Sequence, residues 1–321
     1  MKHGETLPFT QQAGTGRPVV AVLLTCGINN RFPEFENIKY KALLPLKGRP
    51  IVDFVSTALC GSKVEKVFVV HEPEEDLKKV LTGHEKIIFA ECNRPGPKLI
   101  DSGMCGFEKL IDYYGENGLN QKQIMFVPCD IPLVQAQDFD ALIDRAINID
   151  ADYCPTVIRN SLVDEGHTGR HFRKIHLNEL GGDYSFQPIN FIRSRNFRIP
   201  ELIASFNRTS LSDNRGSSTQ KILKISEDAR KDRHSVIGWV RFAYRIAGKG
   251  GVVLSLQLIL DLLRNRLTES KFELAISRTL NVKVGVVESQ CPNFSLDIDK
   301  PSDLDYVSRL ALSKTENSSG E

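Results

Sequence analysis

The stretch VVAVLLTCGINNRFPEFENIKYKALLPLKGRPI, residues 19–51, is the part of the sequence that decides the fold class. It opens with Val19–Leu24, an unbroken apolar run typical of a strand that helices cover on both faces. A long polar loop follows, and apolar residues at helical spacing begin at Ile51. Ligands of open α/β sheets bind at the carboxyl ends of strands, so this loop is the first candidate for a binding site.

The alternation of apolar runs and helical patterns continues along the chain. Strands that alternate with helices favour an α/β fold with a mainly parallel sheet and helices on both faces. The first half predicts further strands at 66–71, 86–91 and 124–128. The less regular second half predicts strands at 153–158, 186–192 and 282–287, helices at 236–247, 255–267 and 270–280, and a final helix from about Pro301. We expect a flexible leader over residues 1–17 and a flexible tail over 313–321.

The composition excludes several classes of protein. The chain has 321 residues, of which 41% are hydrophobic and 26% charged, and its formal net charge is +2. Such a chain is too apolar and too weakly charged to be disordered, and it is long enough to bury a substantial core. The near-neutral charge gives no general attraction for nucleic acid, so we expect any phosphate binding to be local.

The cysteines and the apolar runs indicate a cytoplasmic protein. Seven cysteines are scattered without a C-x-x-C pair, and the N-terminus lacks the apolar core of a signal peptide. We therefore expect reduced thiols, with Cys26 and Cys129 as packing residues. The longest apolar run, Val252 to Leu263, contains Gln257 and Asp261 and falls short of the roughly 20 residues that a membrane span needs. A peripheral membrane helix there is the less favoured alternative.

The polar loop carries residues suited to phosphate. Glycine at Gly27 permits close approach of the backbone, while Arg31 and Lys41 offset negative charge. The loop is neither a Walker loop nor a dinucleotide fingerprint, because G-x-x-x-x-G-K-[ST] and G-x-G-x-x-G are both absent. Taken singly, the residues also fit a structural role in which Gly27 ends a strand, Arg31 is solvated and Lys41 covers apolar surface.

Three segments together resemble the nucleotidyltransferase superfamily, and in particular its MobA-like NTP transferase branch, which is similar to molybdopterin guanylyltransferase. The strand and loop lead into KALLPLKGRPI, residues 41–51, which resembles the family pattern K-x-L-L-P-x-x-G-[KR]-P-[IL]. FVPCDIPLV, residues 126–134, resembles the family's strand that ends in Asp before a Pro-Leu turn. SLDIDKPSDL, residues 295–304, resembles its late D-[IV]-D-x-P-x-D-L segment. The resemblance spans about residues 18–312.

The resemblance implies a fold and a reaction. The expected fold is a Rossmann-like, glycosyltransferase-A-type three-layer sandwich with a mixed, mainly parallel sheet. Its domain would be residues 18–312, with 159–280 as an irregular acceptor-side and helical insertion. The implied reaction is magnesium-dependent transfer of a nucleoside monophosphate from a nucleoside triphosphate to a phosphorylated small-molecule acceptor, with release of pyrophosphate.

The resemblance also implies roles for individual residues. Arg31 and Lys41 would stabilise the triphosphate and the charge that develops in the transition state. Asp130 ends one strand and Asp297 lies far away in sequence, yet both could meet at one sheet edge and hold Mg²⁺, a cation that prefers oxygen ligands. We expect Asp299 to cap the last helix instead. The residues implied in nucleotide binding are Leu24, Thr25, Gly27, Gly96, Lys98 and Ser102, and those implied on the acceptor side are Asn190 and Arg173.

Several alternatives stay open from the sequence alone. Asp130 also fits a cap for the helix after Pro132, and residues 93–103 fit a plain loop with a helix start. The histidines His167, His171 and His176 fit a basic acceptor-side loop or a solvated loop better than a zinc site, because glycines interrupt any helix there. A glycosyltransferase that uses a nucleotide sugar is a second function. A non-catalytic nucleotide-binding protein is a third, because Thr25-Cys26 stand where the family usually carries glycine.

Overall fold

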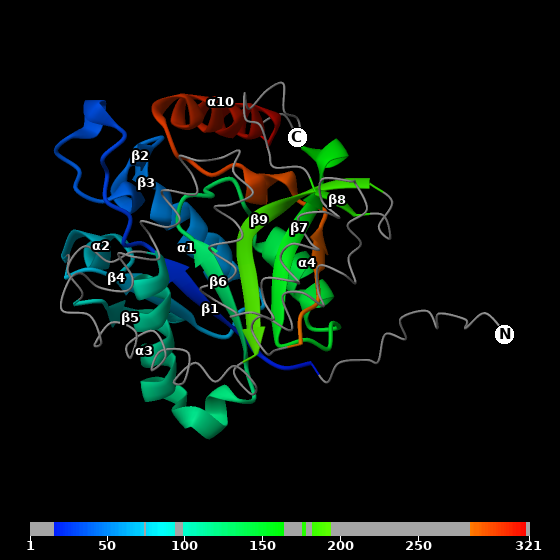
Figure 1. Ribbon diagram of the computed structural model, residues 1–321. Coiled ribbons are helices and arrows are strands. Elements are labelled where there is room, and N and C mark those ends of the chain that lie inside the picture. The colour runs from blue at the N-terminus through cyan, green and yellow to red at the C-terminus, as the bar shows by residue number, and fades with distance from the viewer. Residues whose placement is uncertain are drawn as a thin grey trace, which may run out of the picture.

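The computed structural model describes residues 16–73, 75–93, 99–163, 175–177, 182–193 and 283–318. Most of the expected leader and of the insertion at 159–280 lies outside these residues, as do the predicted helices at 236–247, 255–267 and 270–280. Within the described residues, the chain forms one central sheet with helices on both of its faces (Figure 1).

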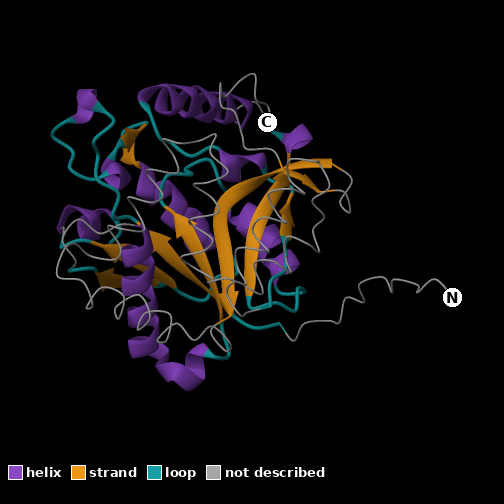
Figure 2. Ribbon diagram, in the orientation of Figure 1, coloured by secondary structure: helices purple, strands orange, loops and turns teal. Residues whose placement is uncertain are grey.

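The sheet contains eight described strands (Figure 2). Four of them are mutually parallel, and β9 runs antiparallel to both of its main neighbours. The last strand, β10, is parallel to β7. From one edge to the other, the order is β5 (Ile87–Glu91), β4 (Val67–His71), β1 (Val19–Leu24), β6 (Gln123–Pro128), β9 (Gly182–Arg193), β7 (Tyr153–Arg159) and β10 (Val287–Ser289), with β8 (Ile175–Leu177) paired to β9.

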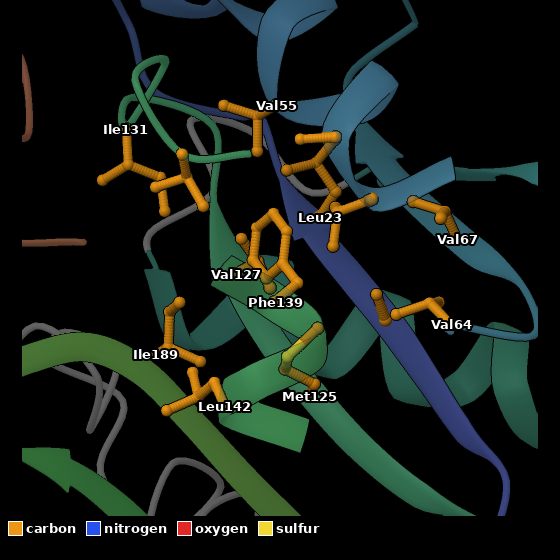
Figure 3. Packing of buried hydrophobic residues seen from close by; sticks show 14 of the residues in the cluster. Leu23, Val55, Val64, Val67, Met125, Val127, Ile131, Phe139, Leu142 and Ile189 are labelled. Carbon is orange, nitrogen blue, oxygen red and sulfur yellow. The ribbon is translucent and has the colours of Figure 1, made fainter. Parts of the chain in front are cut away.

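The apolar run of β1 is buried on both sides, as its composition predicts. Val19, Ala21 and Leu23 belong to one apolar cluster, while Val20 and Val22 belong to another on the opposite face of the sheet. The first cluster (Figure 3) takes in residues of α1 (Ile51–Gly61), α2 (Glu75–Val80) and α4 (Ala136–Ala146). The second takes in residues of α3 (Leu99–Leu119). The predicted Rossmann-like three-layer sandwich with a mixed, mainly parallel sheet is therefore confirmed.

A third apolar cluster attaches the end of the chain to the segment after β1. The hairpin of β2 (Pro45–Leu46) and β3 (Arg49–Pro50) turns at Lys47 and Gly48, both with positive φ, as a tight two-residue hairpin requires. Leu46 packs in this cluster with Ile298 and with residues of α10 (Pro301–Ser318). This packing brings residues 297–299 beside the loop that leaves β1. The short 3₁₀ turns are η1 (Pro33–Phe35), η2 (Lys41–Leu43), η3 (Asn160–Leu162) and η4 (Pro292–Ser295).

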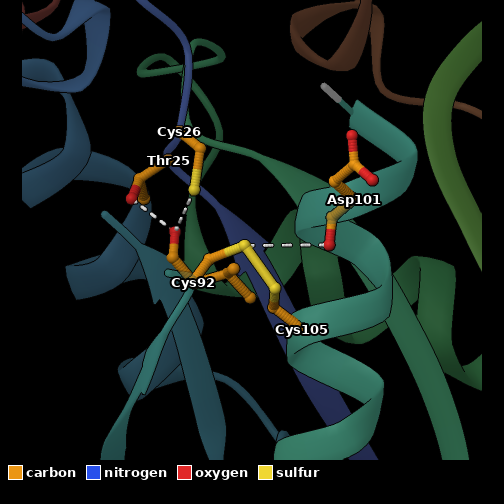
Figure 4. Close-up of a disulfide and its surroundings, with 6 residues drawn as sticks. Thr25, Cys26, Cys92, Asp101 and Cys105 are labelled. Atoms are coloured by element: carbon orange, nitrogen blue, oxygen red, sulfur yellow. Dashed lines mark hydrogen bonds between the residues drawn. A yellow bond between two sulfur atoms is a disulfide. The ribbon is translucent and has the colours of Figure 1, made fainter. Parts of the chain in front are cut away.

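The cysteines correct one expectation. Cys92, directly after β5, and Cys105, in α3, form a disulfide (Figure 4), so the prediction that all seven cysteines are reduced thiols is wrong for this pair. The packing role predicted for Cys26 and Cys129 is confirmed, because each is buried in one of the two main clusters. None of the described helices is long and apolar enough to cross a bilayer, and the run Val252 to Leu263 lies outside the described residues.

We predict that Gly106→Ala destabilises the protein by about 1–3 kcal/mol. A Cβ atom at Gly106 of α3 would lie 2.5 Å from Val22 Cγ1 and 2.8 Å from Val70 Cγ2, and these β-branched side chains have few rotamers with which to yield. Urea unfolding measures the change. The matched control is Gly103→Ala in the same helix, where the new atom would meet Phe126 at an ordinary 3.7 Å and should stabilise by up to about 1 kcal/mol. Equal effects of the two substitutions would contradict this packing.

The disulfide predicts the thiol count of the unreduced protein. Five of the seven cysteines are free, so unfolding without a reductant should release five titratable thiols, and seven after reduction. Because the bond closes a loop in the unfolded chain, Cys92→Ser should lower the free energy of unfolding by about 2–4 kcal/mol. The control is Cys60→Ser, which removes a half-buried free thiol and should change the free energy of unfolding much less. Seven titratable thiols without reduction would contradict the assignment of the Cys92–Cys105 disulfide.

Candidate functional site

The candidate site lies at the carboxyl edge of the parallel strands. Because β4, β1 and β6 are parallel neighbours, the residues that follow them lie at one edge of the sheet. Thr25, directly after β1, is fixed to β4 by two bonds: its backbone N–H and its Oγ1 both donate to the carbonyl of Val70, at 3.1 and 2.6 Å. The thiol of Cys26 donates to the same carbonyl at 3.4 Å (Figure 4). The start of the loop is therefore held in place by β4.

The polar loop after β1 folds back on itself. The amide of Lys41 donates to the carbonyl of Gly27 at 2.8 Å, and the amide of Asn29 donates to the carbonyl of Lys39 at 2.9 Å. The side chain of Asn29 spans the loop, with Nδ2 donating to the carbonyls of residues 35 and 38. A Cβ at position 27 would lie 3.7 Å from that of Lys41. These bonds place Lys41 directly beside Gly27, although the two residues are far apart along the loop.

Lys41 lies among three carboxylates. Its ammonium donates to the carboxylate of Asp130 and, at 2.9 Å, to Oδ1 of Asp299. Asp130, Asp297 and Asp299 each offer an oxygen, and these oxygens lie within 4.8 Å of one another. Arg31 Nη1 lies 3.5 Å from Asp299 Oδ1, with a largely exposed side chain. The predicted meeting of Asp130 and Asp297 at one sheet edge is confirmed; their role as metal ligands stays a prediction.

The backbone of Asp130 helps to hold this arrangement. Its carbonyl accepts the amide of Ile298 at 2.9 Å, and Ile298 is fully buried in the third apolar cluster. The segment 297–299 is thus fixed at its centre, with an aspartate on each side of the buried residue. Both aspartates are half-exposed, whereas Ile298 between them is buried.

The position of Asp299 corrects a second expectation. The cap predicted for it is supplied by Asp303, whose Oδ2 accepts the amides of Asp299 and Lys300 at 2.9 and 3.0 Å at the start of α10. The carboxylate of Asp299 is left to face Lys41. The signal in the sequence was the D-I-D pattern itself, in which an apolar residue separates two aspartates with a period of two.

The charges of the cluster stabilise one another. Burial alone would lower the pKa of Lys41, but the charge and hydrogen bond of Asp130, with those of Asp299, raise it above its usual value. Burial alone would raise the pKa of Asp299, yet the hydrogen bond and charge of Lys41 hold it below the usual value. The ammonium and the carboxylate of this pair are therefore both ionised at neutral pH.

Sequence reasoning missed a second polar group at the same edge. His71 ends β4, and Glu72 follows it. The hydroxyl of Tyr40 donates to Glu72 Oε2 at 3.2 Å, while Glu72 Oε1 is buried and has no hydrogen-bond partner. His71 Nδ1 donates to the carbonyl of Glu72 at 2.5 Å, which leaves Nε2 as a buried acceptor without a partner. No motif in the sequence marked these residues.

The other predicted site residues are placed as follows. Leu24 ends β1 and is half-buried. Ser102, in α3, is buried beside the thiol of Cys26. Asn190 pairs with Phe126 across β9 and β6, four residues before Asp130, and its Oδ1 accepts the hydroxyl of Tyr153 at 2.9 Å, so it stands apart from the aspartates. Gly96, Lys98, Arg173, His167 and His171 lie outside the described residues, and of His176 only the backbone is described, in β8.

The position of His71 predicts a pH dependence of stability. Burial lowers the pKa of His71, so below about pH 7 the unfolded chain binds a proton that the native protein does not. The free energy of unfolding should therefore fall as the pH drops through the usual histidine pKa of about 6.5. Urea unfolding at pH 7.5, 6.5 and 5.5 measures this, and His71→Gln should show a shallower fall. Parallel pH profiles of the two proteins would contradict the prediction.

Comparisons with known proteins agree with this arrangement. Residues 21–180 match the model of the MobA-like NTP transferase domain. A hypothetical transferase from Thermus thermophilus superposes with a TM-score of 0.57 at 18% identity, covering 90% of this chain and 99% of that one. CMP:2-keto-3-deoxy-manno-octonic acid synthetase, solved with CTP, superposes with a TM-score of 0.50 at 12% identity, covering 92% of this chain and 99% of that one. At such identities these two structures bear on the fold alone.

No curated protein matches the chain. The family model covers the strand, the polar loop, Lys41 and Asp130, which are the parts of the site that the first half of the chain supplies. Residues 21–180 thus form a MobA-like NTP transferase domain, and this chain is a nucleotidyltransferase.

Proposed function

We propose that the protein is a magnesium-dependent enzyme that transfers a nucleoside monophosphate from a nucleoside triphosphate to a phosphorylated small-molecule acceptor, releasing pyrophosphate. The observation that carries the proposal is the convergence of Asp130, Asp297 and Asp299, two of which bond Lys41, beside the loop that leaves β1. Such a group combines oxygen ligands for a cation with a fixed positive charge for phosphate at the ligand-binding edge of the sheet.

The donor set fits Mg²⁺. All three ligand candidates are carboxylates, which are the hard oxygen donors that this ion prefers. Lys41 and Arg31 offset part of their charge, but three carboxylates against two cations leave negative charge for a divalent ion to neutralise. We propose Asp130 and Asp297 as the principal ligands, with Asp299 as a third candidate; Lys41 bonds both Asp130 and Asp299. When bound, the ion would neutralise charge on the triphosphate and on the departing pyrophosphate.

The cations of the loop supply the rest of the electrostatics. Lys41 is mostly buried, so its ammonium acts where water screens it little. Arg31 is exposed and close to Asp299, which leaves its planar guanidinium able to meet phosphate oxygens from the solvent side. Both side chains would stabilise the charge that develops as the bond between the α-phosphorus and the bridging oxygen breaks. The backbone around Gly27 offers close approach to the triphosphate.

The acceptor would attack from the remaining side. An oxygen of its phosphate forms a bond to the α-phosphorus, and the pyrophosphate leaves in line with the electron pair of the broken bond. We propose Asn190 and Arg173 for the acceptor side, and Leu24, Thr25, Gly96, Lys98 and Ser102 for the nucleotide side. The cytoplasm remains the proposed location because the substrate is a nucleoside triphosphate, although the Cys92–Cys105 bridge lends this location no support.

The test is exchange of labelled pyrophosphate into a nucleoside triphosphate. We expect exchange that requires Mg²⁺ and the acceptor, and we expect Asp130→Asn to slow it by about 100-fold or more, because the variant removes a charge that the transition state needs. A panel of the four common triphosphates and a broad set of phosphate esters makes up the screen.

Asp144→Asn is the matched control for the exchange assay. It makes the same change of charge at an exposed ion pair with Lys63, at 2.6 Å on the surface of α4, and should leave the rate unchanged. No exchange with any triphosphate across the panel would overturn the proposal. Hydrolysis of a nucleotide sugar without pyrophosphate exchange would favour the glycosyltransferase alternative. Magnesium-independent binding of a triphosphate without turnover would favour a non-catalytic role.

A further inference from the structure

The ammonium of Lys41 bonds carboxylates that are also candidates to hold a metal ion. It donates to Oδ2 of Asp130 and, at 2.9 Å, to Oδ1 of Asp299. The same two residues belong to the acidic cluster, in which oxygens of Asp130, Asp297 and Asp299 lie within 4.8 Å of one another. The lysine and a bound metal ion would therefore draw on the same carboxylates.

A divalent ion at these carboxylates would lie close to the lysine nitrogen. Mg²⁺ binds oxygens at about 2.1 Å, so an ion that shares Oδ1 of Asp299 with Lys41 would lie within about 5 Å of Nζ. Two positive charges at this distance repel each other. Water screens the repulsion little, because the side chain of Lys41 is only 16% exposed. Binding of a metal ion alone therefore works against the contacts that Lys41 makes in the free protein.

The side chain of Lys41 can reach other partners without movement of its backbone. The amide of Lys41 is held by the carbonyl of Gly27 at 2.8 Å, and a Cβ at position 27 would lie 3.7 Å from that of Lys41. The side chain thus starts beside the loop that leaves β1, and its flexible stem can rotate toward a ligand bound there. An ammonium that is mostly buried is costly without an anion, so leaving the aspartates requires new acceptors such as phosphate oxygens.

We propose that Lys41 changes partners when the substrate binds: it pairs with Asp130 and Asp299 in the free protein, and it turns to the triphosphate when a metal ion binds the aspartates. This inference rests on the proposed function. A metal ion alone would leave the ammonium without an anion, and a triphosphate alone would draw the ammonium away from carboxylates that nothing else neutralises. The metal ion and the triphosphate therefore bind cooperatively, and Lys41 is the residue that couples them.

Arg31 should contribute much less to this coupling. Its Nη1 lies 3.5 Å from Oδ1 of Asp299, but its side chain is 62% exposed, so water screens its charge. Lys41 bonds two of the three aspartates from a mostly buried position. Removing the charge of Arg31 should therefore change the affinity for a metal ion alone by less than removing that of Lys41.

The test compares the binding of Mn²⁺ alone with the binding of its triphosphate complex. Mn²⁺ suits the same carboxylate ligands as Mg²⁺, and electron paramagnetic resonance measures its free concentration. Lys41→Met keeps the length of the side chain and removes its charge. We expect the variant to bind Mn²⁺ alone about 10-fold more tightly than the wild type, which is within the usual range of coupling between two ligands.

The triphosphate complex should respond in the opposite direction. Calorimetry with the Mn²⁺ complexes of ATP, GTP, CTP and UTP, without an acceptor, first identifies the triphosphate that the wild type binds. Lys41→Met should bind this complex about 10-fold more weakly, because its phosphates lose their ammonium partner. A defect in folding would weaken the binding of both ligands, so a gain for Mn²⁺ together with a loss for the complex identifies the change of partners.

Lys63→Met is the matched control. Lys63 makes the same kind of ion pair, with Asp144 at 2.6 Å, but both side chains are exposed, so neither affinity should change. Lys41→Arg keeps the positive charge and should bind Mn²⁺ alone as weakly as the wild type does. Adding Asp130→Asn to Lys41→Met should abolish the gain, because the metal ion would bind the carboxylates that the lysine has released.

Unchanged or weaker binding of Mn²⁺ alone by Lys41→Met would overturn the inference. Pyrophosphate exchange by the wild type, and its loss in Asp130→Asn, would still leave the proposed function standing. A gain for Mn²⁺ with no loss for the triphosphate complex would overturn the inference as well, because the lysine would then not turn to the phosphates. If the wild type binds no triphosphate complex, the proposed function and this inference fail together.

Discussion

The ion pairs of Lys41 join parts of the chain that are far apart in sequence. Its ammonium contacts Asp130 and Asp299, which lie 89 and 258 positions further along. Three carboxylates within 4.8 Å of one another would repel if nothing stood among them. The lysine supplies the compensating charge from a mostly buried position, where the attraction is strong. The lysine and the three aspartates are therefore already assembled in the protein as described.

This arrangement depends on apolar packing that lies behind it. Charged side chains keep their positions only if the backbone that carries them is fixed. The third apolar cluster fixes the backbone of the aspartates through Ile298, and that of Lys41 through Leu44, three residues further along. The loop's own bonds, from Asn29 and from the amide of Lys41, remove the freedom that a long polar segment would otherwise have. Preorganised charge of this kind costs little reorganisation at the moment of reaction, which is why it favours catalysis.

The sequence predicted those parts of the molecule whose pattern is local. The apolar run of β1 and the alternation that follows it led to the sheet, and the segment around Lys41 led to the domain family. The meeting of Asp130 with Asp297 was inferred from the resemblance of their two segments to the family, because Asp130 ends a strand at the ligand-binding edge. Asp299 was assigned to a cap because the last helix begins two residues later, but its carboxylate bonds Lys41, and Asp303 accepts the amides at the start of that helix. The partners of Glu72 and Cys92 could not be predicted, because they follow from strand order and helix placement rather than from spacing.

The order of the strands decides which charged side chains lie next to one another at the carboxyl edge of the sheet. Asp130 follows β6, the cationic loop follows β1 and Glu72 follows β4, so acidic and basic side chains alternate across three neighbouring strand ends. On the other side of β6, the antiparallel β9 carries Asn190, the residue that we propose for the acceptor side. An in-line displacement needs the attacking oxygen of the acceptor and the departing pyrophosphate on opposite sides of the α-phosphorus, and side chains fixed on a rigid sheet edge can hold both without any movement of the sheet.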